Sequence, residues 1–332
     1  MCGIVGYVGN RAAVPLVLEG LKRLEYRGYD SAGIAAIWNG QLQVRREQGK
    51  LSQLEQLLSA EPIGGHIAIG HTRWATHGAP HRRNAHPHLD CSGQIAVIQN
   101  GIVENFVALR SRLQTEGHTF ASETDTEVIV HLIEDYMSQG EGLAEAARRA
   151  FNQIRGAHAI VVLSSRQPDT LVAARIGNAG GVTVGLGQGE MYLASDIPAI
   201  LEYTRCTIFL EDREMVVLSA ENARFFNLDG REVHKQATEI SWDPVSAAKG
   251  TYRHFMQKEI LEQARSLTDT LLGRIDFETG LVTLEGLNLP IEIIRAAQKM
   301  VIVACGTSAY AGLVGKFMIE GLARLPVEVD YG

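Results

Sequence analysis

A cysteine occupies the second position of the chain, where it could act as a nucleophile. Initiator methionine is commonly removed before a small residue, and its removal here would leave Cys2 with a free α-amine. A cysteine thiol has a pKa of about 8.5 and an α-amine a pKa of about 7.7–8.0. The amine could therefore accept the thiol proton near neutral pH without help from a histidine. The alternative is that Cys2 is only a small apolar residue at the start of a strand.

Attack on an amide also needs hydrogen-bond donors for the developing oxyanion. Asn100 and Gly101 directly follow an apolar run, Ile95–Gln99, that predicts a strand. The Asn100 side-chain amide and the backbone N–H of Gly101 are the kinds of donor that form such a hole. Asn-Gly is also a frequent turn dipeptide, so a plain turn remains the alternative interpretation.

A free amino acid presents an α-carboxylate and an α-ammonium, and a selective site needs a partner for each. Arg73 offers a guanidinium for the carboxylate, with Thr76 and His77 as further hydrogen-bonding groups and Trp74 as a cover. Asp125 could pair with the ammonium. Arg73 could equally form a surface salt bridge, and Asp125 could be an acidic residue at the N-terminal end of a helix.

Histidines are concentrated in one short part of the chain, which raises the question of a metal site. Their spacing fits neither a HExxH helix nor a zinc finger, and no acidic residue lies between them. We therefore expect hydrogen-bonded structural histidines, and neither a metal nor a cofactor. The five residues are His71, His77, His81, His86 and His88.

Composition and charge are those of an ordinary globular protein. The chain has 332 residues, of which 45% are hydrophobic and 21% charged, with a net charge of −7. This balance gives no basic footprint for nucleic acid. The four scattered cysteines form no CxxC pair, and no apolar run has the roughly 20 residues of a membrane span. Because the N-terminus also lacks the basic region of a signal peptide, we expect a cytoplasmic protein without membrane or nucleic-acid partners.

The first 240 residues predict many strands with a few helices. The turn Asn39-Gly40 indicates a hairpin, and a second hairpin turn lies at Asp229-Gly230. Thr124 is expected to begin a helix cap in the segment Thr124-Asp-Thr-Glu127. Apolar spacing predicts helices at Ala12–Leu24, Leu51–Leu58, Glu104–Glu116 and Asp125–Tyr136. Strands are expected at Gly33–Trp38, Leu42–Arg45, Ile67–Gly70, Ile95–Gln99, Ala157–Ser164, Thr170–Arg175, Thr183–Leu186, Met191–Ala194, Cys206–Leu210, Glu214–Leu218 and Ala223–Leu228.

Beyond residue 240 the composition changes. Ile240–Gly250 is polar and suits a linker, and Tyr252–Leu272 predicts a long helix. The apolar run Val301–Cys305 indicates a buried parallel strand. Thr307 and Ser308 follow at the start of a helix, where they could bind a phosphate or form an ordinary cap.

Six segments in this order resemble the glutamine–fructose-6-phosphate aminotransferase (glucosamine-6-phosphate synthase) family, and the likeness covers essentially the whole chain. The most specific is Arg23–Gly33, and the helix at Tyr252–Ile260 resembles the interdomain helix of that family. The six are Cys2–Gly6, Arg23–Gly33, His71–Gly78, Asn84–His88, Asn100-Gly101 and Ser122–Glu127.

The resemblance implies a fold and a division into domains. It implies an α+β class, a four-layer αββα sandwich of the N-terminal nucleophile hydrolase type, over residues 2–240. Residues 241–288 would be a linker with an interdomain helix. Residues 289–332 would begin an α/β sugar isomerase (SIS) domain that is incomplete in this chain.

The resemblance also implies roles. Cys2 would be the nucleophile and its amine the base, with Asn100 and Gly101 as the oxyanion hole. Glutamine would be held by Arg73, Thr76, His77 and Asp125, and Trp74 would gate ammonia. Arg27 and Tyr29 lie in a segment, Arg27–Ser31, that would close over glutamine.

The resemblance has limits at one residue and at the end of the chain. Gln99 stands where that family usually has a histidine, so the position can donate and accept hydrogen bonds but cannot carry charge. The isomerase acid–base residues would lie beyond Gly332. We therefore expect glutamine hydrolysis from this chain, and fructose 6-phosphate as a partner only if the rest of the isomerase domain is supplied. Full-length members are expected to be homo-oligomers.

Overall fold

The structure is a computed structural model that describes residues 2–75, 78–241, 252–272, 274–276, 278–280, 282–283 and 290–332. The chain divides into two compact units, Met1–Phe255 and Met256–Gly332, and each is described by itself. The linker expected at Ile240–Gly250 falls mostly on residues 242–250, which lie outside the described residues.

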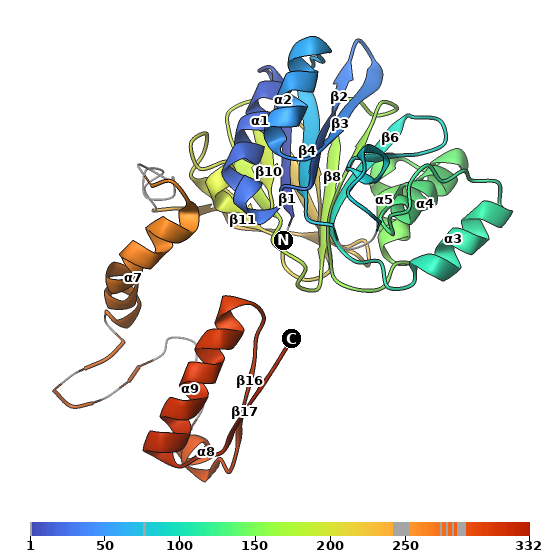
Figure 1. Cartoon of the computed structure of the whole chain (residues 1–332). Coiled ribbons are helices and arrows are strands. Elements are labelled where there is room, and N and C mark those ends of the chain that lie inside the picture. The colour runs from blue at the N-terminus through green and yellow to red at the C-terminus, as the bar shows by residue number, and fades with distance from the viewer. Residues whose placement is uncertain are drawn as a thin grey trace. The chain divides into compact units, whose positions relative to one another are not determined.

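The first unit contains two antiparallel sheets (Figure 1). In spatial order, the eight-stranded sheet consists of β15 (Thr238–Glu239), β11 (Cys206–Phe209), β9 (Thr183–Leu186), β10 (Glu190–Ala194), β1 (Gly3–Gly9), β4 (Ile67–Arg73), β2 (Ser31–Trp38) and β3 (Gln41–Gln48). The seven-stranded sheet consists of β14 (Glu232–Val233), β13 (Ala223–Asn227), β12 (Glu214–Leu218), β8 (Leu171–Ile176), β7 (His158–Ser164), β6 (Ile95–Gly101) and β5 (His88–Leu89).

The two sheets stack on each other, and helices cover their outer faces. Successive strand residues point to opposite faces, so Ile4 and Val8 of β1 join the core between the sheets while Val5 and Tyr7 face helices. The eight-stranded sheet is covered by α1 (Ala13–Leu24) and α2 (Leu51–Ala60). The seven-stranded sheet is covered by α3 (Phe106–Thr115), α4 (Glu127–Ser138) and α5 (Leu143–Phe151). These four layers confirm the expected αββα sandwich.

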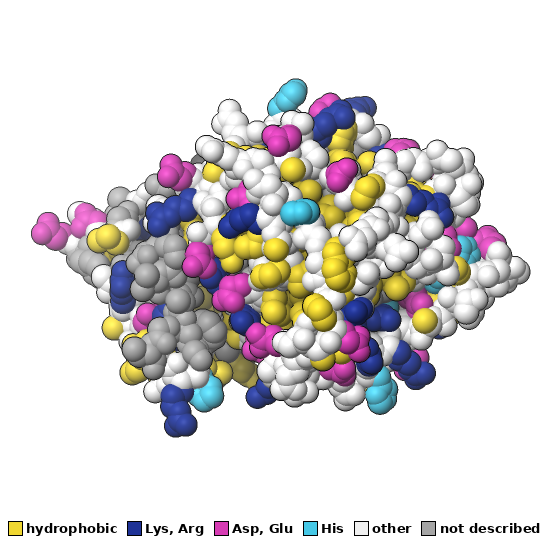
Figure 2. Space-filling view, turned by 90° about the horizontal axis from the view of Figure 1, so that it is seen from above, with side chains coloured by type: hydrophobic (Ala, Val, Ile, Leu, Met, Phe, Trp, Pro, Cys, Tyr) yellow, Lys and Arg dark blue, Asp and Glu magenta, His cyan; other side chains and the backbone are white. Residues whose placement is uncertain are grey.

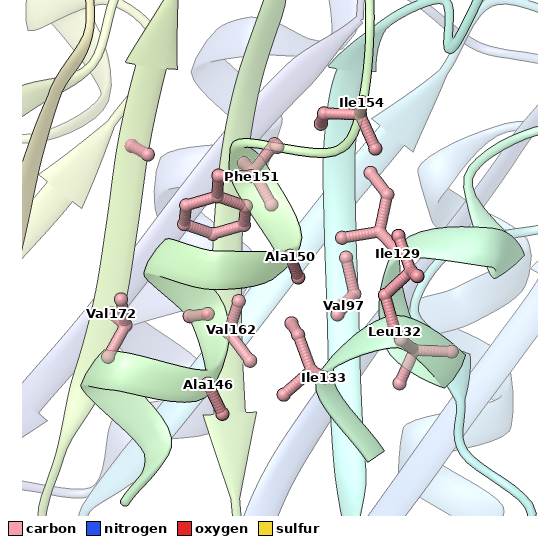
Figure 3. Close-up of a cluster of buried hydrophobic side chains, with 14 of the residues drawn as sticks. Val97, Ile129, Leu132, Ile133, Ala146, Ala150, Phe151, Ile154, Val162 and Val172 are labelled. Atoms are coloured by element: carbon pink, nitrogen blue, oxygen red, sulfur yellow. The ribbon is translucent and has the colours of Figure 1, made fainter. Parts of the chain in front are cut away.

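The core under α4 and α5 shows how closely these layers interlock (Figure 3). Ile129 and Ile133 of α4 and Phe151 of α5 pack against Val97 and Val162 of the sheet, and all five are fully buried. Burying an aliphatic or aromatic side chain of this size stabilises a fold by roughly 1.5–3 kcal/mol. This packing fixes α4, and with it the residues that lie just before its first turn.

The sequence analysis missed α5. Its buried face repeats with helical spacing and consists of three alanines between Leu143 and Phe151. The turn Asn39-Gly40 was predicted correctly, since both residues have positive φ and join β2 to β3. Short 3₁₀ helices complete the unit at η1 (Glu25–Arg27), η2 (Arg82–Asn84) and η3 (Ile197–Ala199).

The described residues of the second unit form three helices and two strands. They are α7 (Phe255–Leu271), α8 (Ile291–Ala296), β16 (Met300–Val303), α9 (Thr307–Ala323) and β17 (Val327–Asp330). β16 and β17 are parallel and are joined through α9, which packs on both strands through Gly312. This arrangement confirms the predicted parallel strand and following helix, but the predicted burial of the strand is wrong, since Val301 and Val303 are 55% and 60% exposed.

On the face shown in Figure 2, basic and acidic side chains are interspersed and do not gather by sign. Among the described residues, each helix is too short or too polar to cross a membrane.

Candidate functional site

The sulfur of Cys2 lies at the edge where β1 meets β4. The antiparallel register pairs Gly3 with Thr72, which brings Cys2 beside the end of β4. The backbone N–H of Trp74 donates to Sγ of Cys2 at 3.2 Å, and the carbonyl oxygen of Trp74 lies 3.6 Å from the same sulfur. Burial raises the pKa of the Cys2 thiol, while the hydrogen bond from Trp74 acts in the opposite direction. The resting sulfur is therefore a thiol that needs a base.

The side-chain amide of Asn100 faces Cys2 from the other sheet. Its Nδ2 donates to the carbonyl oxygen of Cys2 at 3.2 Å. Nε2 of His71 lies 3.2 Å from Oδ1 of Asn100 and 3.0 Å from the carbonyl oxygen of Gln99. Because both contacts are acceptors, Nε2 of His71 carries the hydrogen. Burial lowers the pKa of His71 to about 3, so the imidazole is neutral and holds the amide with its NH₂ toward Cys2.

Gly101 ends β6 in a conformation that only glycine adopts easily. Its φ is +122°, and a Cβ built there would lie 2.1 Å from the carbonyl oxygen of Ala157. A side chain at this position would thus displace the neighbouring backbone. The backbone just after Asn100 is held in place by this close approach.

A buried hydrogen-bond network continues inward from Asn100 through Gln99. Nε2 of His158 donates to the carbonyl oxygen of Arg155 at 3.1 Å, so the proton of this neutral ring is on Nε2. Nδ1 of His158 is therefore the acceptor, and Nε2 of Gln99 donates to it at 2.8 Å. Oε1 of Gln99 accepts from Thr126 at 2.6 Å. The backbone N–H of Gln99 donates to Nδ1 of His86 at 3.2 Å. Burial lowers the pKa of both histidines, so the network is uncharged and each of these donors has one acceptor.

Arg73 lies at the end of β4, buried beside the nucleophile. Its Nη2 donates to the carbonyl oxygen of Gly78 at 3.1 Å, and the register of β2 pairs it with Ser31. Burial lowers the pKa of the guanidinium, and the charges of Asp30, Cys2 and Asp125 oppose that shift. The carboxylates of Asp30 and Asp125 therefore favour the charged form of Arg73.

Asp125 is buried directly before α4. Its Oδ2 accepts a hydrogen bond of 2.7 Å from the backbone N–H of Val103, two residues after Gly101. This bond ties the start of α4 to the strand end that carries Asn100. The carboxylate also contributes to the electrostatic field at Arg73, as expected for two residues of one site.

The helix cap predicted at Thr124 is wrong. α4 begins at Glu127, and its N-cap residue Thr126 makes no side-chain cap. Thr124 instead contacts Ser122 and His88 at 3.0 Å through its hydroxyl group. Glu127 stabilises the preceding segment, because its carboxylate accepts from the backbone N–H groups of Ala121 and Ser122, both at 2.7 Å.

The segment from Arg27 to Asp30 lies against Trp74. Nη1 of Arg27 forms an ion pair with Asp196 at 2.9 Å. The rings of Tyr29 and Trp74 meet edge to face with centroids 5.5 Å apart, and each side chain is 50% exposed. Asp30 accepts from the backbone N–H of Ala75, and its own N–H donates to the carbonyl oxygen of Arg73 at 3.1 Å. The aromatic pair of Tyr29 and Trp74 is thus tied through Asp30 to the residues that contact Cys2.

The structure brings most of the sequence-based candidates together. Cys2 accepts hydrogen bonds from both Trp74 and Asn100. It also interacts electrostatically with Arg73. Thr76 and His77 lie outside the described residues. Thr307 and Ser308 lie exposed at the first turn of α9 in the second unit.

Three further residues support the site, Asp30, His71 and Gln99. Asp30 could have been found, since it lies in the segment Arg27–Ser31 that was singled out. The prediction that His71 and Gln99 make hydrogen bonds is confirmed, but no pattern along the chain gives their partners: His71 contacts Asn100 of the other sheet, and Gln99 contacts His158 on the neighbouring strand of its own sheet.

Comparisons with known proteins place these residues in context. Residues 59–241 match a family model described as a glutamine amidotransferase domain. The chain is 51% identical over 330 residues to a glutamine–fructose-6-phosphate aminotransferase (isomerizing) of Symbiobacterium thermophilum, which covers 99% of this chain and 54% of that relative. A relative with the same name from Caldanaerobacter subterraneus subsp. tengcongensis is 49% identical, again over 99% of this chain and 54% of its own length. The chain thus spans about half the length of these curated relatives.

A solved structure supports the fold. Glutamine phosphoribosylpyrophosphate amidotransferase from B. subtilis superposes with a TM-score of 0.62 at 20% identity, covering 99% of this chain and 65% of that one. At this identity the likeness concerns the fold alone.

Proposed function

The chain belongs to the glutamine amidotransferase family, and on this basis we propose that its residues 2–240 hydrolyse L-glutamine with Cys2 as nucleophile. One arrangement carries the proposal. The sulfur of Cys2 accepts an N–H from Trp74, while the NH₂ group of Asn100 is held next to the same residue. A nucleophile and an oxyanion donor placed side by side are the two groups that acyl transfer from an amide requires.

The base in this mechanism is the α-amine of Cys2, exposed when Met1 is removed. A buried thiol with a raised pKa gives up its proton only to a nearby acceptor. His71 is the nearby imidazole, but its pKa of about 3 makes it too weak a base near neutral pH. An α-amine with an ordinary pKa of about 7.7–8.0 is matched to the task.

The reaction proceeds in two steps. Sγ of Cys2 attacks the side-chain carbonyl carbon of glutamine as the thiol proton moves to the α-amine, and Asn100 and the backbone N–H of Gly101 stabilise the oxyanion. The ammonium group returns that proton to the leaving nitrogen, and the C–N bond breaks. Ammonia is released, and the glutamyl group remains bound to Cys2 as a thioester. Water, deprotonated by the same amine, then releases glutamate and restores the thiol.

Recognition of glutamine follows from the charges around the sulfur. Arg73 binds the α-carboxylate and Asp125 the α-ammonium, with Thr76 and His77 as additional hydrogen-bonding residues. The buried position of Arg73 and Asp125 supports this assignment, because charge-assisted hydrogen bonds are strongest away from water. Trp74 and Tyr29 cover the site, and the ion pair of Arg27 with Asp196 fixes the base of that cover.

The ammonia serves a larger reaction in the whole protein. The curated relatives are named glutamine–fructose-6-phosphate aminotransferases, so we assign fructose 6-phosphate as the acceptor of the nitrogen. Residues 241–288 then link the glutaminase domain to a sugar isomerase domain that begins at 289. Thr307 and Ser308 at the first turn of α9 suit a sugar phosphate there. We place this reaction in the cytoplasm and expect full-length members of the family to be homo-oligomers.

Intact mass and covalent labelling test this function. The purified chain should lack Met1 and gain one equivalent of 6-diazo-5-oxonorleucine, a glutamine-like electrophile, on the peptide that begins at Cys2. Cys2→Ala should abolish both labelling and glutamate release. The matched control is Cys206→Ala, which removes an exposed thiol on β11 and should leave both unchanged. Full glutamate release from a chain that retains Met1 would contradict the mechanism.

A further inference from the structure

Four metal-binding side chains from distant parts of the sequence meet beside α4. Cys91 lies in the turn between β5 and β6, His118 follows α3, and His131 and Glu134 lie one turn apart on α4. One ligand atom of each lies within 4.8 Å of all the others. We propose that these four residues bind a zinc ion.

The distances between ligand atoms approach those of a tetrahedral zinc site. Bond lengths of about 2.3 Å to sulfur and 2.0–2.2 Å to nitrogen and oxygen give edges of about 3.6 Å for S–N and 3.4 Å for N–O. Sγ of Cys91 lies 3.7 Å from Nδ1 of His118 and 3.7 Å from Nδ1 of His131. Oε2 of Glu134 lies 2.9 Å from each of the same two nitrogens. These four edges differ from the tetrahedral values by about 0.5 Å or less, and the two remaining edges are no longer than 4.8 Å.

The outer nitrogens of the two imidazoles face carboxylates. Nε2 of His118 lies 2.7 Å from Oδ1 of Asp135, and Nε2 of His131 lies 3.8 Å from Oε1 of Glu127. A carboxylate on one ring nitrogen keeps the proton there and turns the lone pair of the other nitrogen outward, as in most zinc-binding histidines. For His118, the lone pair of Nδ1 then faces Oε2 of Glu134, and a cation between the two atoms would remove this repulsion. The separation of 3.8 Å between His131 and Glu127 is longer than a hydrogen bond, but it places a carboxylate on the outer side of the His131 ring.

The nature of the ligands favours zinc. A thiolate and two imidazoles suit borderline-soft metals, whereas Mg²⁺ and Ca²⁺ prefer oxygen ligands alone. Cys91 as thiolate and Glu134 as carboxylate balance the two positive charges of the ion. Four protein ligands without an open position are typical of a structural site.

The turn that carries Cys91 is held in place before any ion binds. Oδ1 of Asp90 accepts from the backbone N–H groups of Gln94 and Ile95, both at 2.7 Å, and Gly93 has a φ of +68°. The backbone N–H of Thr119 donates to Sγ of Cys91 at 3.4 Å. Such a donor stabilises a thiolate and keeps the sulfur directed toward the cluster.

The site connects the β5–β6 turn to α4, the helix that directly follows Asp125. His131 lies one turn from Glu127, whose carboxylate holds the backbone of Ala121 and Ser122. That segment leads directly to Asp125. The ion would therefore stabilise the position of Asp125 without touching glutamine.

Metal analysis of the intact chain tests the proposal. Protein purified without a metal column should contain about one zinc per chain, and Cys91→Ser or His131→Ala should lose most of it. The controls Cys2→Ser and Cys206→Ser, which remove thiols outside the cluster, should keep the full content. Asp135→Asn should keep the ligands but weaken zinc binding by roughly 10–100-fold, because it removes a hydrogen bond to the His118 ring.

A second measurement avoids variants that fail to fold. The wild-type chain, stripped with a chelator and refilled with Co²⁺, should show the intense visible bands of a tetrahedral site with a thiolate charge-transfer band. Its midpoint of thermal unfolding should fall on stripping and recover with Zn²⁺. Folded wild-type protein that takes up neither ion, or zinc content unchanged in Cys91→Ser, overturns the proposal and leaves a metal-free ion-pair cluster.

Discussion

Nε2 of His71 lies 3.2 Å from Oδ1 of Asn100, whose Nδ2 donates to the carbonyl oxygen of Cys2 at 3.2 Å. An asparagine amide can rotate by half a turn and present its oxygen where its NH₂ group was. The neutral His71 prevents this, since its only hydrogen near Asn100 requires an acceptor. A residue that does not touch the substrate thus determines which end of Asn100 faces the reacting carbonyl.

We expect Asn100→Ala to lower the kcat of glutamine hydrolysis by roughly 10²–10³-fold with little change in KM. His71→Ala should lower kcat less, because the amide is present but free to rotate. His71→Gln should restore part of the rate, since its amide can donate in place of Nε2. Steady-state glutamate release measures all three. The exposed residue Asn222 gives the control Asn222→Ala, and an equal loss of rate there would contradict the assignment.

Arg73→Lys should raise the KM for glutamine by roughly 10–100-fold while kcat changes little. The planar guanidinium binds a carboxylate through two parallel hydrogen bonds, which a lysine cannot do. A hydrogen bond to a charged group is worth about 1.5–3 kcal/mol. Arg224→Lys, at an arginine whose side chain is 61% exposed, is the matched control. A variant that binds glutamine as tightly as the wild type would exclude Arg73 as the carboxylate partner.

Gly101→Ala should destabilise the fold more than a positive φ alone explains. A positive φ costs a non-glycine residue about 1–2 kcal/mol, and Gly101 adds a contact of 2.1 Å with the carbonyl oxygen of Ala157. Gly140→Ala separates the two effects, because Gly140 has a φ of +95° and nothing within 4 Å of the added Cβ. Urea unfolding of both variants gives the comparison. Equal losses of stability in the two variants would mean that the contact with the carbonyl oxygen of Ala157 adds nothing to the cost of Gly101→Ala.

Stability should fall as pH drops below about 6.5. Burial lowers the pKa of both His71 and His88 to about 3 in the folded chain, whereas an unfolded histidine has a pKa of about 6.5. Between these values the unfolded state binds protons that the folded state does not, so unfolding becomes easier as pH falls. Each of the two histidines contributes about 1.4 kcal/mol per pH unit in this window.

The free energy of unfolding in urea at pH 7, 6 and 5 checks this dependence. His88→Gln should reduce the slope of the unfolding free energy against pH by the contribution of one histidine, about 1.4 kcal/mol per pH unit. His66→Gln, at an exposed position, should leave the slope unchanged. A slope that is the same in His88→Gln and in the wild type would show that His88 does not titrate in this way.

Much of the fold was predictable because its signals are local. The continuous apolar run of β7, the positive-φ turn at Asn39-Gly40 and the apolar face of α1 all follow from neighbouring residues. The helix α5 was missed although its signal is also local, since its buried residues repeat with helical spacing. The cap at Thr124 was predicted wrongly because Glu127, whose carboxylate in a capping box would accept from the backbone N–H of Thr124, accepts instead from those of Ala121 and Ser122.

The sequence by itself determined the chemical groups of the site: a thiol beside a potential amino terminus, an Asn-Gly pair, an arginine and an aspartate. Only the tertiary structure decided how they face one another. The network through Gln99 and the cluster of Cys91 with His118, His131 and Glu134 join residues from separate strands and helices. A hydrogen bond or a metal–ligand bond depends on distances of a few ångströms, and packing of sheets and helices sets these distances between residues that are far apart along the chain.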